Sequence, residues 1–144
     1  MYIGLKHLHS SLPYLLFIAI LVVLVFSLIG IFNKTTFDGK RKKAVLFAMI
    51  LFHVQWTVGL ILYFVSPLVK NIGESMSDST DRLYALEHPL MMTIALVLVT
   101  IARSKSKKTE DSSMNKTVFV LFALALSCMI FCLPQSWAGL SMFS

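Results

Sequence analysis

Four long apolar segments, separated by short polar stretches, take up most of this 144-residue chain. They run from about 12 to 32, 44 to 67, 82 to 103 and 117 to 133. A helix needs about 20 apolar residues to cross the hydrocarbon of a bilayer, and an apolar segment of this kind satisfies its backbone groups there as a helix. The pattern therefore predicts an all-α fold, a four-helix transmembrane bundle, as a single domain over residues 1–144.

The composition agrees with exposure to lipid. Hydrophobic residues make up 57% of the chain and charged residues only 14%, whereas soluble domains lie nearer to one half and one quarter. The four segments leave little chain for a soluble catalytic domain. The sequence also has no nucleophile–base pair, phosphate-binding loop or zinc signature, so we expect no independent enzymatic activity.

The basic residues are distributed unevenly between the loops. Of 13 Lys and Arg residues, five lie within 33–43 and five within 103–116, which leaves Lys6, Lys70 and Arg82. Loops rich in Lys and Arg stay on the cytoplasmic side of a membrane. We therefore expect a multi-pass protein of the bacterial inner (cytoplasmic) membrane, with both termini on the outer, periplasmic side. This distribution explains the net charge of +6 through contact with the lipid bilayer and argues against nucleic acid as a partner.

Local signals refine the helix ends. Asp78 is placed to cap the third helix, and Pro134 is placed to end the fourth. Pro89 lies inside the third helix, where it removes a backbone donor, frees the carbonyl of Ala85 and predicts a kink. Tyr63 stands near the end of the second helix, at a depth typical of the membrane interface.

Histidines are the residues with the most chemical potential. His9, His53 and His88 belong to three different helices, and ionisable residues within membrane segments usually face the bundle interior or a partner. A b-type haem takes axial ligands from facing helices, so we predict that two of these three histidines bind the iron of haem b. The alternative is that each forms a hydrogen bond between helices. His7 is expected to be an interfacial residue.

The depth of each histidine ranks the possible pairs. At about 1.5 Å per residue, His53 lies about 15 Å from the basic end of its helix, His88 about 22 Å and His9 about 36 Å. This ranks His53 with His88 first and His9 with His88 second. His7 and His9 point about 200° apart around a helix, and we favour His9 as the inward-facing one.

The neighbours of these histidines suit a flat apolar ligand. Gly59 and Ala95 allow close approach of a macrocycle or a helix. Large apolar walls are expected from Phe52, Trp56, Met91 and Met92.

Other polar residues near the histidines have two possible roles. Glu87 could orient His88, although a solvated carboxylate is the favoured interpretation. Gln55 and Thr57 are expected to join helices rather than bind a quinone. Cys128 and Cys132 share a helix face and are expected to pack as small apolar residues rather than bind a metal.

Three segments carry a resemblance to a known family: KHLHSSLPYLLF, FHVQWTVGLILYFVSP and RLYALEHPLMMTIALVLVTIARSKSKK. Together they resemble small bacterial four-helix membrane proteins labelled cytochrome b-like and, more distantly, the haem-binding halves of haem A synthase and other b-type membrane cytochromes. The resemblance implies His9, His53 and His88 as candidate ligands. The chain departs from the distant relatives because its last helix has no histidine.

These observations lead to a functional hypothesis with alternatives. The leading one is a b-haem protein that passes electrons between the membrane quinol pool and a partner membrane protein, as a subunit or a homo-oligomer. A cofactor-free accessory or scaffold subunit of a larger membrane complex is the alternative. A histidine-based carrier of protons or metal ions ranks last, because no acidic residue lies mid-helix to relay protons.

Overall fold

The computed structural model describes residues 1–67, 69 and 71–133, and within these residues the chain is helical with no strand. Four long helical stretches form the bundle. The elements are α1 (Tyr2–Phe32), α2 (Gly39–Val65), the short α3 (Ile72–Ser75), then α4 (Ser79–Arg82), the π-helical turn η1 (Leu83–Glu87) and α5 (His88–Ser106) in one continuous stretch, and α6 (Ser113–Phe131).

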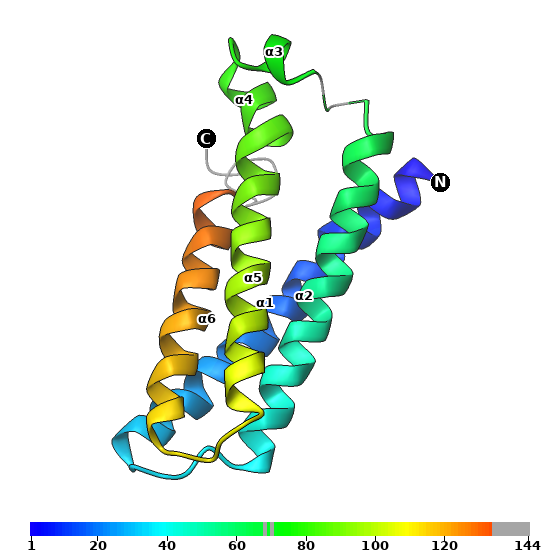
Figure 1. Cartoon of the computed structure of the whole chain (residues 1–144). Coiled ribbons are helices and arrows are strands. Elements are labelled where there is room, and N and C mark those ends of the chain that lie inside the picture. The colour runs from blue at the N-terminus through cyan, green and yellow to red at the C-terminus, as the bar shows by residue number, and fades with distance from the viewer. Residues whose placement is uncertain (68, 70, 134–144) are drawn as a thin grey trace, which may run out of the picture.

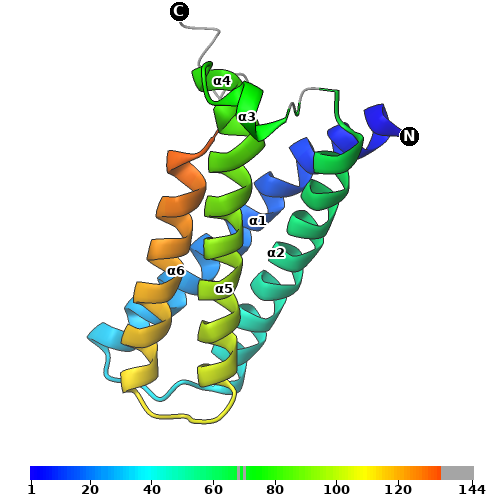
Figure 2. The ribbon, with the colours of Figure 1, turned by 45° about the horizontal axis from the view of Figure 1, so that its top comes forward.

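The helices are arranged so that α1 and α5 are diagonal to each other. Helix α1 packs against α2 and α6, and α5 packs against the same two helices. Helix α1 runs obliquely behind the other three, from the side of α2 at one end to the side of α6 at the other (Figures 1 and 2). We call the end with the two basic connections (33–38 and 107–112) the basic end, and the end where α1 begins the histidine end.

Most of the apolar surface of these helices faces outward. Four stretches, including 79–106 as one, are long and apolar enough to cross a membrane, and only 22 to 33% of each apolar window is buried. A soluble protein rarely exposes an apolar patch of more than a few hundred Å². The described part of the chain therefore has the surface of a multi-pass membrane protein, as predicted.

Helix α1 begins at Tyr2, ten residues before the expected start at about residue 12. The hydroxyl groups in this region do not interrupt the helix, because each donates to a carbonyl one turn earlier. Ser10 Oγ donates to Lys6 O (2.6 Å) and Ser11 Oγ donates to His7 O (2.8 Å). The early start places His7 and His9 on a helix rather than in a tail.

Pro89, inside the third long helical stretch, leaves a backbone carbonyl without its helical donor. Pro89 cannot donate to Ala85 O, as predicted, and Tyr63 Oη of α2 donates to that carbonyl instead (3.0 Å). The turn just before Pro89 is the π-helical η1, which is a usual form of local helix distortion.

The predicted cap at the start of the third long helical stretch is also confirmed, since the Asp78 carboxylate accepts from backbone N–H groups in the first turn of α4.

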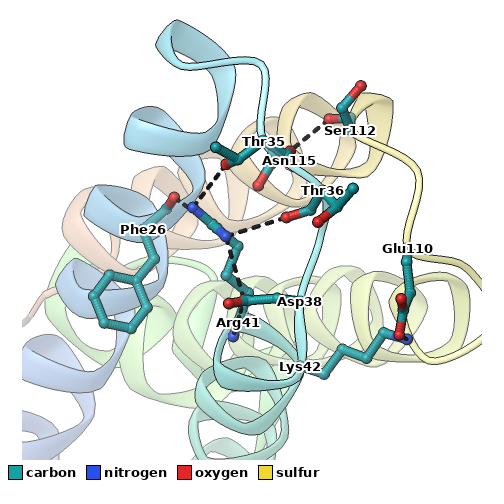
Figure 3. Close-up of polar contacts among 9 residues, drawn as sticks. All are labelled: Phe26, Thr35, Thr36, Asp38, Arg41, Lys42, Glu110, Ser112 and Asn115. Atoms are coloured by element: carbon teal, nitrogen blue, oxygen red, sulfur yellow. Dashed lines mark hydrogen bonds and ion pairs between the residues drawn. The ribbon is translucent and has the colours of Figure 1, made fainter.

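An arginine holds the basic end together (Figure 3). Arg41 Nε donates to Phe26 O (3.2 Å), and its two terminal nitrogens donate to Thr36 O (3.1 Å) and Thr35 Oγ1 (3.0 Å). Arg41 also pairs with Asp38 (3.2 Å), which caps α2. These bonds fix the connection between α1 and α2 to both helices.

The two basic connections are also joined to each other. Phe37, which is fully buried, donates its N–H to Glu110 O (2.9 Å). Lys42 Nζ pairs with the Glu110 carboxylate (3.2 Å; Figure 3). These contacts join the connection between α1 and α2 to the connection between α5 and α6.

Candidate functional site

Two histidines face each other near the histidine end of the bundle. His9 projects from α1 and His88 from the start of α5, and their ring centroids lie 6.3 Å apart with an angle of 80° between the ring planes. Because α1 and α5 are diagonal neighbours, the two rings meet across the centre of the bundle. This is the pair that the sequence ranked second.

Both rings line a cavity of about 440 Å³. Its walls are mostly apolar and aromatic and come from all four long helices. The expected wall residues Phe52, Trp56 and Met92 line it, whereas Met91 does not. The volume lies within the range of small-molecule and cofactor sites, about 300–1,000 Å³.

A backbone carbonyl at the end of α6 orients His88. His88 Nδ1 lies 2.9 Å from Cys132 O, and a carbonyl can only accept, so Nδ1 carries the proton. The lone pair of Nε2 is then free to bind a ligand. Cys132 caps α6, where the last carbonyls have no helical donor.

Gln55 of α2 holds His9 through two atoms. Gln55 Nε2 donates to His9 O (2.9 Å) and lies 3.1 Å from His9 Nδ1. The carbonyl of His9 lacks its helical donor because Pro13, four residues later, has no N–H. Gln55 therefore joins α2 to α1, as predicted.

The amide oxygen of Gln55 is buried and has no hydrogen-bond partner in the described structure. In the orientation above, the amide donates to His9 Nδ1, so the ring proton lies on Nε2. Rotating the amide by 180° would let Oε1 accept from His9 Nδ1–H and would free the lone pair of His9 Nε2. It would also break the bond from Gln55 Nε2 to His9 O and set two acceptor oxygens against each other. Binding of a metal by His9 Nε2 requires this second arrangement.

Gly59 gives His9 the space that it needs. A Cβ at this position would lie 2.8 Å from Cε1 of the His9 ring, closer than carbon atoms approach. The expectation that Gly59 permits a close approach is confirmed, and the group that approaches is the His9 ring.

His53 lies elsewhere. It is exposed on the outer face of α2, its Nδ1 bonds to Met49 O of the same helix (2.9 Å), and it does not line the cavity. The depth argument put His53 and His88 at similar levels but could not give the direction of each side chain around its helix. His7 is also exposed and outside the cavity, as expected.

The remaining polar residues have local partners. Glu87 pairs with Arg82 (2.7 Å) and does not orient His88. Thr57 Oγ1 donates to His53 O in its own helix rather than joining two helices. Among the residues described, Cys128 and Cys132 are both free thiols, with Cys132 buried.

Two features of the site were not found from the sequence. The Cys132 carbonyl has no sequence signal, because any residue type at a helix end offers the same acceptor. Lys6 also lines the cavity. Its position three residues before His9, and so on the same helix face, is a signal that could have identified it.

Comparison with protein-family models, curated proteins and solved structures finds no match for this chain. The geometry of the cavity is therefore the basis for a functional assignment.

Proposed function

We propose that this protein is a b-type haem-binding membrane protein that carries electrons, with His9 and His88 as the axial ligands. The observation that carries the proposal is the pair of imidazoles facing each other across one cavity at 6.3 Å. His88 is held through Nδ1–H, which leaves its Nε2 lone pair free for a metal, and His9 would free its Nε2 lone pair once the Gln55 amide is turned. The pair His9 and His88 replaces the pair His53 and His88, which the sequence alone favours, because His53 does not line the cavity.

The distance suits one metal ion between two rings. An imidazole nitrogen binds a metal at about 2 Å and lies about 1 Å from its ring centre, so two opposed rings on one ion have centroids about 6 Å apart. The separation of His9 and His88 agrees with this value. The Gly59 backbone, where a Cβ would meet the His9 ring, leaves room for that ring position.

The available ligands favour a macrocycle over a bare metal ion. In the part of the chain that the structure describes, no three His, Cys, Asp or Glu side chains are grouped to hold a metal. A porphyrin brings four nitrogen atoms of its own, so a haem needs only two protein ligands. Two imidazoles and apolar walls match that requirement.

The residues of this chain perform the tasks that such a site needs. Haem, when bound, supplies one-electron chemistry. His88 is oriented by the Cys132 carbonyl and His9 by Gln55, which fixes the direction of both ligands. Hydrogen bonds of this kind also tune the basicity of the imidazoles. Phe52 and Met92 line the cavity and limit access of water to it.

The proposal also includes the membrane in which the protein lies and its topology there. The Lys and Arg residues of the two basic connections support a topology in which the basic end lies in the cytoplasm of a bacterium and both termini and the histidine pair lie toward the periplasmic side of the inner membrane. A haem there would exchange electrons with the quinol pool and with a partner membrane protein.

The test is an absorption spectrum of protein purified from cells supplied with haem. Wild type should show the reduced-minus-oxidised bands of a six-coordinate b-haem. His9→Ala and His88→Ala should each abolish these bands or convert them to a five-coordinate form, because each removes an axial ligand.

His53→Ala and His7→Ala are the matched controls, since both histidines lie in α1 or α2 and outside the cavity. Both variants should keep the wild-type spectrum. Loss of the bands in His53→Ala, with retention in His9→Ala, would overturn the ligand assignment. A colourless wild type under these conditions would overturn haem binding itself.

One observation favours the alternative, an accessory subunit of a larger membrane complex. His53 places a polar ring on the exposed face of α2, midway along an apolar helix. Polar side chains at such depth are costly in lipid and are suited to contact with another helix. Stable co-purification with a large partner would support this role if His53→Leu abolishes it. A role as an accessory subunit is compatible with haem binding, whereas a colourless preparation would leave the accessory role alone.

A further inference from the structure

Lys6 is the residue on which a more specific inference rests. Among the described residues that line the cavity, Lys6 is the one with a Lys, Arg, Asp or Glu side chain. It lies on the cavity face of α1, about 4.5 Å along the helix from His9 toward the histidine end. Tyr2, four residues before Lys6 and so on the same face of α1, also lines the cavity. Ser66 borders the cavity from the end of α2.

Lys6 has no acidic partner in the described part of the chain. The other basic residue described at this end, Arg82, is already paired with Glu87 (2.7 Å). Lys6 takes part in no ion pair with another described residue, and it is exposed at the cavity mouth. A positive charge therefore stands at the entrance of a largely apolar cavity without a counter-charge from the residues that the structure describes.

We propose that this mouth is a subsite for carboxylates, and that Lys6 binds the acidic edge of the occupant of the cavity. The inference rests on the proposed function, for which the occupant is haem and the carboxylates are its two propionates. In this proposal Lys6 orients the ligand: the apolar edge of the ligand lies toward Phe52 and Met129 inside the bundle, and the acidic edge lies toward Lys6 at the histidine end.

The same charge discriminates between ligand classes. A neutral quinone ring in this cavity would leave Lys6 without a counter-charge, whereas a dicarboxylate ligand supplies one. Opposite charges attract most strongly where water is partly excluded, as at a mouth that is bordered by apolar walls. The charge of Lys6 thus favours an acidic amphipathic ligand over a neutral one.

The experiment compares haem with its dimethyl ester, which keeps the iron and the ring but has no carboxylate charge. Both are titrated into haem-free full-length protein in a neutral detergent. For Lys6→Met the dissociation constant for haem should rise about fivefold, the size of one accessible ion pair, while that for the ester should not change. Lys6→Arg keeps the charge and should bind haem like wild type.

Lys107→Met is the matched control. It makes the same change of charge at an exposed site at the basic end, and it should alter neither dissociation constant. The orientation would also predict a lower haem midpoint potential in Lys6→Met, because a nearby positive charge stabilises the reduced, less positive site.

Each other outcome overturns the proposal in a distinguishable way. Equal weakening of haem and ester in Lys6→Met would mean that Lys6 supports the fold rather than the carboxylates. Unchanged haem binding in this variant would mean that Lys6 faces lipid headgroups or solvent only. If wild type binds neither form, the proposed function fails, and the subsite fails with it.

Discussion

At the scale of single residues, the two imidazoles are held by different kinds of partner. His88 bonds to a backbone carbonyl, which can only accept, and so its proton is fixed on Nδ1. His9 Nδ1 lies beside Gln55 Nε2, which also donates to His9 O, so the ring proton lies on Nε2 in this arrangement. It moves to Nδ1 only if the amide turns and gives up its bond to the carbonyl. Gln55 is therefore the residue whose substitution should change the chemistry of the site most selectively.

Gln55→Leu removes both contacts to His9. We expect haem affinity to fall about 10- to 100-fold, as it does when an orienting partner of a metal ligand is lost. The measurement is a haem titration followed by absorbance. A wild-type affinity in this variant would show that Gln55 does not orient the ligand.

Gln55→Glu should instead change the redox potential. A carboxylate can only accept, so it gives up the bond to His9 O, but it accepts from His9 Nδ1–H more strongly than an amide does and makes the ring a stronger donor to iron. This stabilises the oxidised site, so the midpoint potential should fall in a redox titration. A potential equal to that of wild type would contradict the proposed contact, and Thr57→Val, which touches only its own helix, is the control.

At the scale of helices, α2 compensates for two prolines. Pro13 leaves the carbonyl of His9 without a helical donor, and Pro89 does the same to Ala85. Both carbonyls accept instead from side chains of α2, namely Gln55 and Tyr63. Helix α2 is thereby attached to α1 and α5, the two helices that carry the histidine pair.

Tyr63→Phe should lower the free energy of unfolding by about 1–3 kcal/mol, because it leaves the Ala85 carbonyl unpaired. The same substitution should cost less in a Pro89→Ala background, where an N–H is restored four residues after Ala85. Thermal unfolding of the four proteins in detergent gives the coupling. Additive effects would show that Tyr63 does not compensate for the proline.

The basic end offers a second helix-scale prediction. Asn115 of α6 is fully buried, donates to Thr35 O (2.8 Å) and Ser112 O (3.0 Å), and lies directly against Gly30 of α1. A Cβ at residue 30 would overlap with the Asn115 side chain. Gly30→Ala should therefore destabilise the protein by about 1–3 kcal/mol.

Gly4→Ala is the matched control, because Gly4 is also in α1 and a Cβ there would meet nothing within 4 Å. It should leave stability unchanged or raise it by about 0.5–1 kcal/mol, since alanine favours the helix. Equal effects of the two substitutions in thermal unfolding would contradict the tight packing of α1 against α6.

At the scale of the whole molecule, orientation can be tested with single cysteines. In a background with Cys128→Ala and Cys132→Ala, Lys107→Cys should react with an impermeant maleimide only after the cells are opened. Ser77→Cys, at the opposite end and also exposed, should react in spheroplasts whose inner membrane is intact. The reverse pattern would place the basic loops outside.

The sequence predicted the helices better than the site. Four apolar runs determine the number of helices, and Pro89 and Asp78 gave correct local details. The ligand pair depended on the direction of each side chain around its helix and on the early start of α1, and hydrophobic periodicity is weak when most faces of a helix are apolar. For this reason the sequence alone favours His53 over His9 as the partner of His88, although His9 is the histidine that lies near His88.

Helix α6 contributes no imidazole, yet its terminal carbonyl determines how the His88 ring is turned. The length of α6 therefore determines where this acceptor lies relative to the His88 ring. One inserted residue would rotate the end of the helix by about 100° and advance it by about 1.5 Å, which would take the acceptor away from the ring. In this bundle the number of residues in one helix, rather than the identity of any one of them, fixes the angle of a side chain on another.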